Sequence, residues 1–191
     1  MIYHKQVIGF GSPEHGTGTT CISLSVANFL YSKERKKTAY LELNPSNQIH
    51  FLGTYANNHA FTYFGITLFP NVTLSSLPQI LEQDYEYFIL DMGILNPNTA
   101  LTFSQCDKQF IIGSLSLLKQ QSVIQKIETL LKTPPIHKES VTILGNPGIK
   151  ESNSAIFSKS FAKIIDVPFI ENPFQIASDN FGFYKNLLER N

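Results

Sequence analysis

The hydrophobic residues of this chain form two patterns that alternate along its length. Short unbroken runs predict buried strands, which we place at 6–10, 38–43, 61–69, 87–90, 108–113, 141–144 and 168–170. Stretches with hydrophobic residues three or four apart predict helices. We place these at 19–32, 74–83, 119–132, 154–165 and 179–189.

The order of these elements predicts the class of fold. Strands that are hydrophobic throughout, each followed by a helix, are typical of a parallel sheet that is covered on both faces. We therefore predict an α/β fold, a three-layer sandwich with a mostly parallel sheet and helices on both faces. The length of 191 residues suits one domain with a full core, and neither a linker nor a repeat interrupts it, so we expect a single domain over 1–191.

Composition and charge narrow the classes of function. Fifteen Lys and Arg balance fifteen Asp and Glu, which gives no strong nucleic-acid signal. The two cysteines, Cys21 and Cys106, are too few for a disulfide framework. No apolar run approaches the roughly 20 residues of a transmembrane helix, and the N-terminus has no secretory signal pattern. We expect a cytoplasmic protein without a transmembrane segment.

A glycine-rich loop joins the first predicted strand to the first predicted helix, in the stretch VIGFGSPEHGTGTTCISL at 7–24. Free N–H groups at a helix N-terminus attract phosphate, and glycines let the backbone approach its oxygens. The loop therefore predicts a phosphate site. Its candidate residues are Gly16, Thr17, Gly18, Thr19, Thr20 and Cys21.

The lysine that such a loop normally carries is missing. In the standard pattern G-x-x-x-x-G-K-[ST], alignment on Gly18 puts Thr19 at the lysine position and Thr20 at the hydroxyl position. Alignment on Gly16 puts Thr17 and Gly18 there instead. Loss of this charge weakens phosphate binding, and it impairs phosphoryl transfer more. A glycine-rich turn without a ligand is the alternative.

A dinucleotide-binding loop is a second alternative. The pattern G-x-G-x-x-G fits Gly9 and Gly11, but it then requires glycine where Glu14 stands. A carboxylate facing a pyrophosphate is repulsive. In this alternative Glu42, at the end of the second predicted strand, would bind the ribose.

Five segments of the chain, in the same order, resemble the ParA/MinD family of deviant-Walker P-loop ATPases. They are SPEHGTGTTCISLSVANFL at 12–30, TAYLELNPSNQ at 38–48, YEYFILDMG at 85–93, CDKQFIIGSL at 106–115 and VPFIENPFQIASD at 167–179. The resemblance covers nearly the whole length. It implies a P-loop NTPase-like fold and a site for ATP or ADP with Mg²⁺.

The resemblance also implies roles for single residues. Thr20 and Asp91 stand where the family holds Mg²⁺, and Asn146 and Pro173 stand near the place of the adenine. Glu42 stands at the first switch acid, which makes it the candidate catalytic residue. From the residues alone, Asp91 and Thr20 are also read as helix or loop caps.

Three departures from the family pattern concern charge. The signature lysine falls on Glu14, the loop lysine on Thr19, and the second switch acid on Asn44. We therefore expect at most a very weak ATPase. Two functions stay open. One is weak ATP or ADP binding with a localisation or regulatory role, through a protein partner or self-association. The other is a pseudo-ATPase scaffold that binds a protein partner and no nucleotide.

Overall fold

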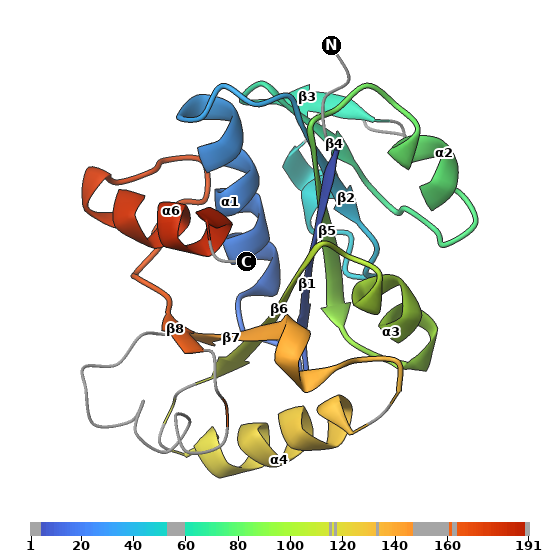
Figure 1. Ribbon diagram of the computed structural model, residues 1–191. Coiled ribbons are helices and arrows are strands. Elements are labelled where there is room, and N and C mark those ends of the chain that lie inside the picture. Colours follow the sequence, from blue (N-terminus) through green and yellow to red (C-terminus); the bar gives the residue numbers. More distant parts are fainter. Residues whose placement is uncertain are drawn as a thin grey trace.

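The computed structural model describes residues 5–52, 60–114, 116, 118–132, 134–146, 161 and 164–189. Eight strands form one sheet in the order β3-β4-β2-β5-β1-β6-β7-β8 (Figure 1). Neighbouring strands run parallel except β3 and β4, which are antiparallel. The predicted α/β fold with a mostly parallel sheet is confirmed.

The strands and helices follow one another in nearly the predicted order. The strands are β1 Gln6–Ser12, β2 Thr38–Glu42, β3 Phe61–Tyr63, β4 Ile66–Phe69, β5 Tyr87–Ile94, β6 Lys108–Ser114, β7 Val141–Asn146 and β8 Ile164–Asp166. The α-helices are α1 Thr19–Ser32, α2 Leu77–Leu81, α3 Pro97–Ser104, α4 Gln120–Leu131 and α6 Phe181–Glu189. Short 3-10 helices are η1 Ile49–Leu52, η2 Lys138–Ser140 and η3 Ser178–Asn180.

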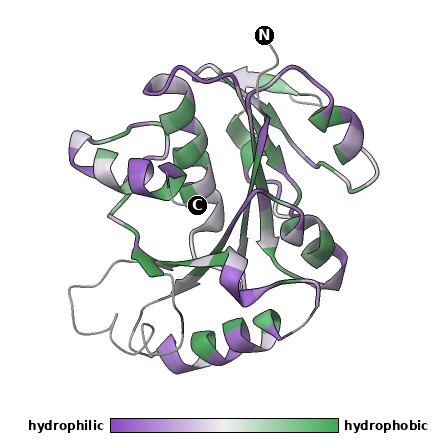
Figure 2. Cartoon of the chain, viewed as in Figure 1, coloured by the Kyte–Doolittle hydropathy of each residue, from purple (hydrophilic) through white to green (hydrophobic). Residues whose placement is uncertain are grey.

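Hydrophobic clusters fill both sides of the sheet. One cluster packs buried residues of α1 and α6 against the sheet, and in it the rings of Phe29 and Tyr184 stack with centroids 4.8 Å apart. The other contains buried residues of α2, α3 and α4. In Figure 2 α4 shows alternating hydrophobic and hydrophilic patches, as expected for a helix with one face on a core. No helix in the described part of the chain is long and apolar enough to cross a membrane.

Two strand predictions are corrected by the structure. The expected strand at 61–69 is a hairpin of β3 and β4, because Phe64 and Gly65 adopt left-handed φ angles of 47° and 81° and turn the chain. The last strand is Ile164–Asp166, whereas residues 168–170 form no strand.

One helix prediction is corrected, and one helix was missed. The predicted helix at 154–165 is wrong at its end, where Ile164 and Ile165 belong to β8, and most of it lies outside the described residues. Helix α3, Pro97–Ser104, was not predicted. Asn96 begins it with a capping box, in which its side chain accepts from the N–H groups of Asn98 and Thr99.

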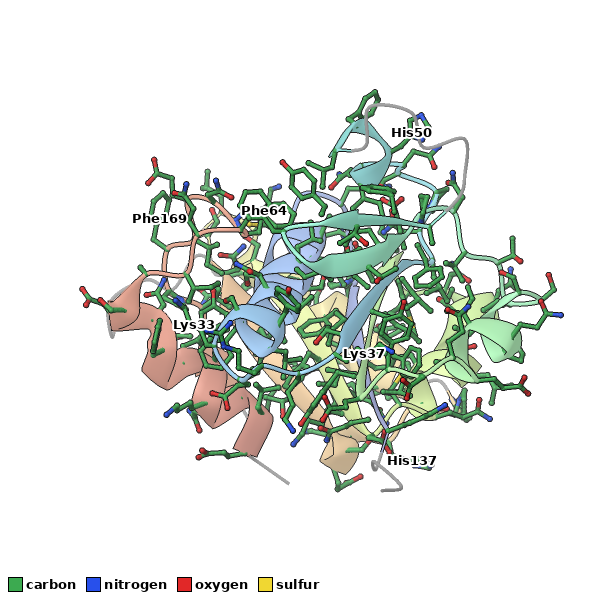
Figure 3. All side chains as sticks on the ribbon, turned by 90° about the horizontal axis from the view of Figure 1, so that it is seen from above. Lys33, Lys37, His50, Phe64, His137 and Phe169 are labelled. Carbon is green, nitrogen blue, oxygen red and sulfur yellow. The ribbon has the colours of Figure 1, made fainter. Side chains whose placement is uncertain are left out.

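Parallel strands bring the ends of β1, β2 and β5 to one edge of the sheet. Asp91 of β5 is in register with Glu42 of β2 on one side and with Phe10 of β1 on the other. The loop between β1 and α1 lies at this edge. Several lysines lie at the opposite edge, near the start of β2, where Figure 3 shows Lys33 and Lys37. The lysines shown there are therefore remote from the glycine-rich loop.

Candidate functional site

A cavity of about 600 Å³ opens around the glycine-rich loop, and we call it the loop cavity. Its volume lies in the range of small-molecule sites. It is lined by the loop and by the segments that follow β2 and β5. The residues are Ser12, Glu14–Cys21, Leu43–Ser46, Gln48, Met92–Ile94, Asn96 and Thr99.

The backbone of the loop leaves the start of α1 without a side-chain cap. Gly16 and Gly18 have φ angles of 74° and 90°, in the left-handed region that favours glycine. Gly18 is the N-cap of α1, and no side chain caps that end of the helix. The first N–H groups of α1 are therefore available, together with the positive end of the helix dipole.

Two hydroxyls of the loop are engaged with each other. Thr17 Oγ1 and Thr19 Oγ1 lie 3.1 Å apart, and the two residues are only 3% and 7% exposed. Asn146, at the end of β7, donates from Nδ2 to the carbonyl oxygen of Thr17 at 2.6 Å. A Cβ on Gly18 would lie 2.5 Å from the same Nδ2. Asn146, predicted near the adenine, thus holds the loop and is not among the residues that line the cavity.

Thr20 and Asp91, the predicted Mg²⁺ ligands, are brought together by the fold. The Thr20 hydroxyl donates to Asp91 Oδ2 at 2.6 Å, and the Tyr40 hydroxyl donates to the same oxygen at 2.8 Å. The N–H of Gly93 donates to Oδ1 at 3.0 Å. Burial raises the pKa of Asp91, while these hydrogen bonds lower it.

Hard oxygen donors of this kind fit Mg²⁺, which commonly uses one or two protein ligands together with phosphates and water. Thr20, which lines the loop cavity, and Asp91 are the residues that would hold the ion. Asp91 is 0% exposed and does not line that cavity, so it would act through the Thr20 hydroxyl. Among the described residues there is no group of three or more His, Cys, Asp or Glu side chains that could hold a metal ion. An Mg²⁺ ion here would depend on phosphate oxygens, whose charge it would neutralise when bound.

Glu42, the candidate catalytic residue, faces the chain that follows β2. Its side chain is 0% exposed, and Oε1 accepts from the N–H groups of Gln48 at 2.8 Å and Ile49 at 3.4 Å. Asn44 accepts from the N–H of Ser46 at 2.9 Å and donates to the carbonyl oxygen of Asp91. Glu42 is not among the lining residues of the loop cavity, and these contacts shape the segment 44–49.

The pKa of Glu42 predicts a pH-dependent contribution to stability. Burial raises this pKa above its ordinary value of 4.5, so ionisation costs more in the folded than in the unfolded state. Stability from this group is therefore present at low pH and lost as pH rises through the raised pKa. Relative to the wild type, Glu42→Gln should gain free energy of unfolding as pH increases. Urea titrations across the acidic and neutral range check this, and a difference that stays constant or falls with pH contradicts it.

Three of the predicted residues line a neighbouring cavity of about 410 Å³. Pro173 lines it, and Thr20 and Cys21 line both this cavity and the loop cavity. Asn28 of α1 donates to the carbonyl oxygen of Pro173 at 3.2 Å. Of the predicted binding residues, Gly16–Cys21 thus line one cavity, Pro173 lines the next, and Asn146 contacts the loop.

The charge of the loop cavity comes from one acid. Of its described lining residues, Glu14 is the one Asp or Glu, and none is Lys or Arg. Lys126 of α4 forms an ion pair with Glu14, with Nζ 2.6 Å from Oε2. No pattern in the sequence pairs residues so far apart.

Asn96 and Thr99 line the loop cavity but were not predicted as site residues. They had a local signal in the helix-starting stretch NPNT.

No protein-family model matches the sequence. No curated protein matches it significantly either.

Solved structures do match the fold. A ParA family ATPase from Chlorobium tepidum superposes with a TM-score of 0.71 at 18% identity, covering 88% of this chain and 86% of that one. MinD, the septum site-determining protein from Pyrococcus horikoshii, complexed with Mg-ADP, gives 0.62 at 12% identity over 85% and 81%. The MinC:MinD cell division complex of Aquifex aeolicus gives 0.60 at 14% identity over 95% and 85%. The predicted ParA/MinD-like fold is thus confirmed.

Proposed function

We propose that this protein binds ADP or ATP with Mg²⁺ weakly at Gly16–Cys21, hydrolyses it slowly or not at all, and acts in localisation or regulation through association with a protein partner or with itself. The observation that carries the proposal is a loop whose backbone suits phosphate, in a cavity whose described lining has no Lys or Arg. The Mg-ADP complex of MinD, which shares the fold, supports the choice of ligand.

Weak binding follows from the loss of charge. A charge-assisted hydrogen bond contributes about 1.5–3 kcal/mol, and a neutral one about 1 kcal/mol. Backbone N–H groups of the loop remain for the phosphates, and Thr20 and Asp91 remain for the metal. Compared with the standard phosphate-binding loop, the site has the backbone groups but lacks the lysine.

Little or no hydrolysis follows from the same loss. Phosphoryl transfer depends almost entirely on positioning and on stabilising the charge of the transition state. Thr19 adds no positive charge, and its hydroxyl is engaged with Thr17. Glu42 is directed at Gln48 and Ile49, and Asn44 carries an amide that does not act as a base.

An association role is supported by the fold and by the proposed weak binding and slow hydrolysis of nucleotide. The MinC:MinD complex shows a protein of this fold bound to another protein. A protein that binds nucleotide weakly and hydrolyses it slowly exchanges the nucleotide faster than it turns it over, so its state follows the nucleotide concentration. The partner of this chain would then respond to whether the loop cavity is filled.

A scaffold without nucleotide is the second candidate function, and one set of contacts favours it. The bond between Thr17 and Thr19 and the bond from Asn146 satisfy polar groups of the loop without a ligand. Glu14 in addition places an acid in the cavity. Such a loop would serve as a turn, and the surface of the protein would carry the function.

Thermal melting with and without nucleotide separates the two functions. At ten times the dissociation constant, Mg-ADP or Mg-ATP should stabilise the fold by about 1.4 kcal/mol, which is a shift of about 3–6 °C for a chain of this size. We expect this shift at millimolar nucleotide and a smaller one without Mg²⁺. No shift with either nucleotide contradicts binding and supports the scaffold. Phosphate release at or near background is expected in either case.

A further inference from the structure

Glu14 and Lys126 form an ion pair between two cavities. Glu14 lines the loop cavity, and Lys126 lines a separate cavity of about 430 Å³ between α3 and α4. Lys126 Nζ lies 2.6 Å from Glu14 Oε2. The carboxylate of Glu14, in the loop between β1 and α1, is therefore held by a cation of α4.

The backbone of Glu14 is fixed, whereas its side chain is held by fewer contacts. The hydroxyl of Ser12 donates to the carbonyl oxygen of Glu14 at 2.9 Å and lies 3.1 Å from that of Gly93. In the side chain, Oε1 is buried and has no hydrogen-bond partner among the described residues. Without Lys126, neither carboxylate oxygen would have a hydrogen-bond partner there, and no such contact would fix the orientation of the carboxylate.

The ion pair contributes little to stability by itself. The Lys126 side chain is 49% exposed and the Glu14 side chain 18%. Pairs with such access to water contribute about 0–1 kcal/mol, because solvent screens them and two long side chains must be ordered. A larger effect is expected on a phosphate in the loop cavity, since an unpaired carboxylate there would repel it.

We propose that Lys126 is a positioning residue for nucleotide binding: it neutralises Glu14 and holds its carboxylate toward α4, away from the phosphates. The inference rests on the proposed function of the loop. The Lys126 ammonium lies outside the loop cavity, so it would affect nucleotide binding through Glu14 and without contacting the nucleotide.

A double-mutant cycle tests this role. Calorimetric titration with Mg-ADP at physiological ionic strength compares the wild type with Lys126→Ala, Glu14→Gln and the double variant. Lys126→Ala should weaken binding about fivefold, the size expected for one partly screened repulsive charge. Glu14→Gln should bind at least as tightly as the wild type. In the Glu14→Gln background, Lys126→Ala should have little further effect, because the carboxylate it controls is gone.

Two further variants distinguish charge from structure. Lys126→Arg keeps the charge and should restore wild-type affinity. Lys132→Ala removes another exposed lysine next to α4 and should leave affinity unchanged. Melting of each variant without nucleotide should show little change in stability.

The outcomes separate this inference from the proposed function. If the wild type binds Mg-ADP and Lys126→Ala binds it equally well, the positioning role is wrong while the proposed function stands. If Lys126→Ala weakens binding equally in both backgrounds, Lys126 acts directly on the ligand and the role through Glu14 is overturned. If no variant binds Mg-ADP, the proposed function itself fails, and this inference fails with it.

Discussion

Thr19→Lys should raise the affinity for Mg-ADP by about ten- to a hundredfold. The substitution places a full positive charge at the start of α1, where the loop provides N–H groups but no cation. A charge-assisted bond to phosphate contributes about 1.5–3 kcal/mol, which corresponds to this range. Calorimetric titration of both proteins with Mg-ADP measures the gain directly.

A matched variant separates charge from chain length at this position. Thr19 is 7% exposed, and either substitution removes its contact with Thr17. Thr19→Met introduces a long side chain without charge and should give no gain. An equal gain from Met and Lys would mean that the affinity comes from opening the loop. No gain from Lys would mean that the loop cavity is closed to phosphate for reasons beyond the missing charge.

Phe29→Ala should lower the free energy of unfolding by about 3–5 kcal/mol, the usual cost of removing a buried phenylalanine. Phe29 lies on α1 and is 0% exposed. Its ring stacks on Tyr184 at 4.8 Å and meets Phe181 edge-on at 5.8 Å, so it joins α1 to α6. The resulting cavity would loosen both helices. Urea unfolding monitored by circular dichroism measures the loss.

The control is the same substitution at an exposed position. Phe169 is 83% exposed and is labelled in Figure 3. Phe169→Ala should change the free energy of unfolding by no more than about 0.5 kcal/mol. A loss below about 1 kcal/mol at Phe29 would contradict the packing of α6 on α1, because a side chain at a true core position costs more.

The sequence predicted those parts of the fold that depend on local patterns. Unbroken hydrophobic strands and the spaced residues of α1 and α4 were sufficient for the layers and for the parallel sheet. The hairpin of β3 and β4 was missed because Phe64 adopts a left-handed φ that its residue type does not favour. Helix α3 was missed because it is short and its hydrophobic pattern is weak, although Asn96 and Pro97 marked its start.

The candidate site likewise has parts that the sequence predicted and parts that it did not. The loop Gly16–Cys21 is contiguous, so its glycines could be recognised in the sequence. Thr20 and Asp91 are far apart in the chain, and their association was inferred from the family resemblance. The Thr20 hydroxyl oxygen lies 2.6 Å from Asp91 Oδ2. The contact of Lys126 with Glu14 could not be predicted, because it depends on how α4 is placed against the loop.

The proposed nucleotide site is tested most directly by the backbone amide spectrum of the isotope-labelled protein during titration with Mg-ADP. We predict that the largest shifts occur at Gly16, Gly18, Thr19 and Thr20, whose N–H groups would face the phosphates, with smaller shifts near Asp91. They should saturate only at high nucleotide, as expected for weak binding. Absence of shifts at millimolar Mg-ADP, or shifts confined to residues outside the loop cavity, would contradict the account.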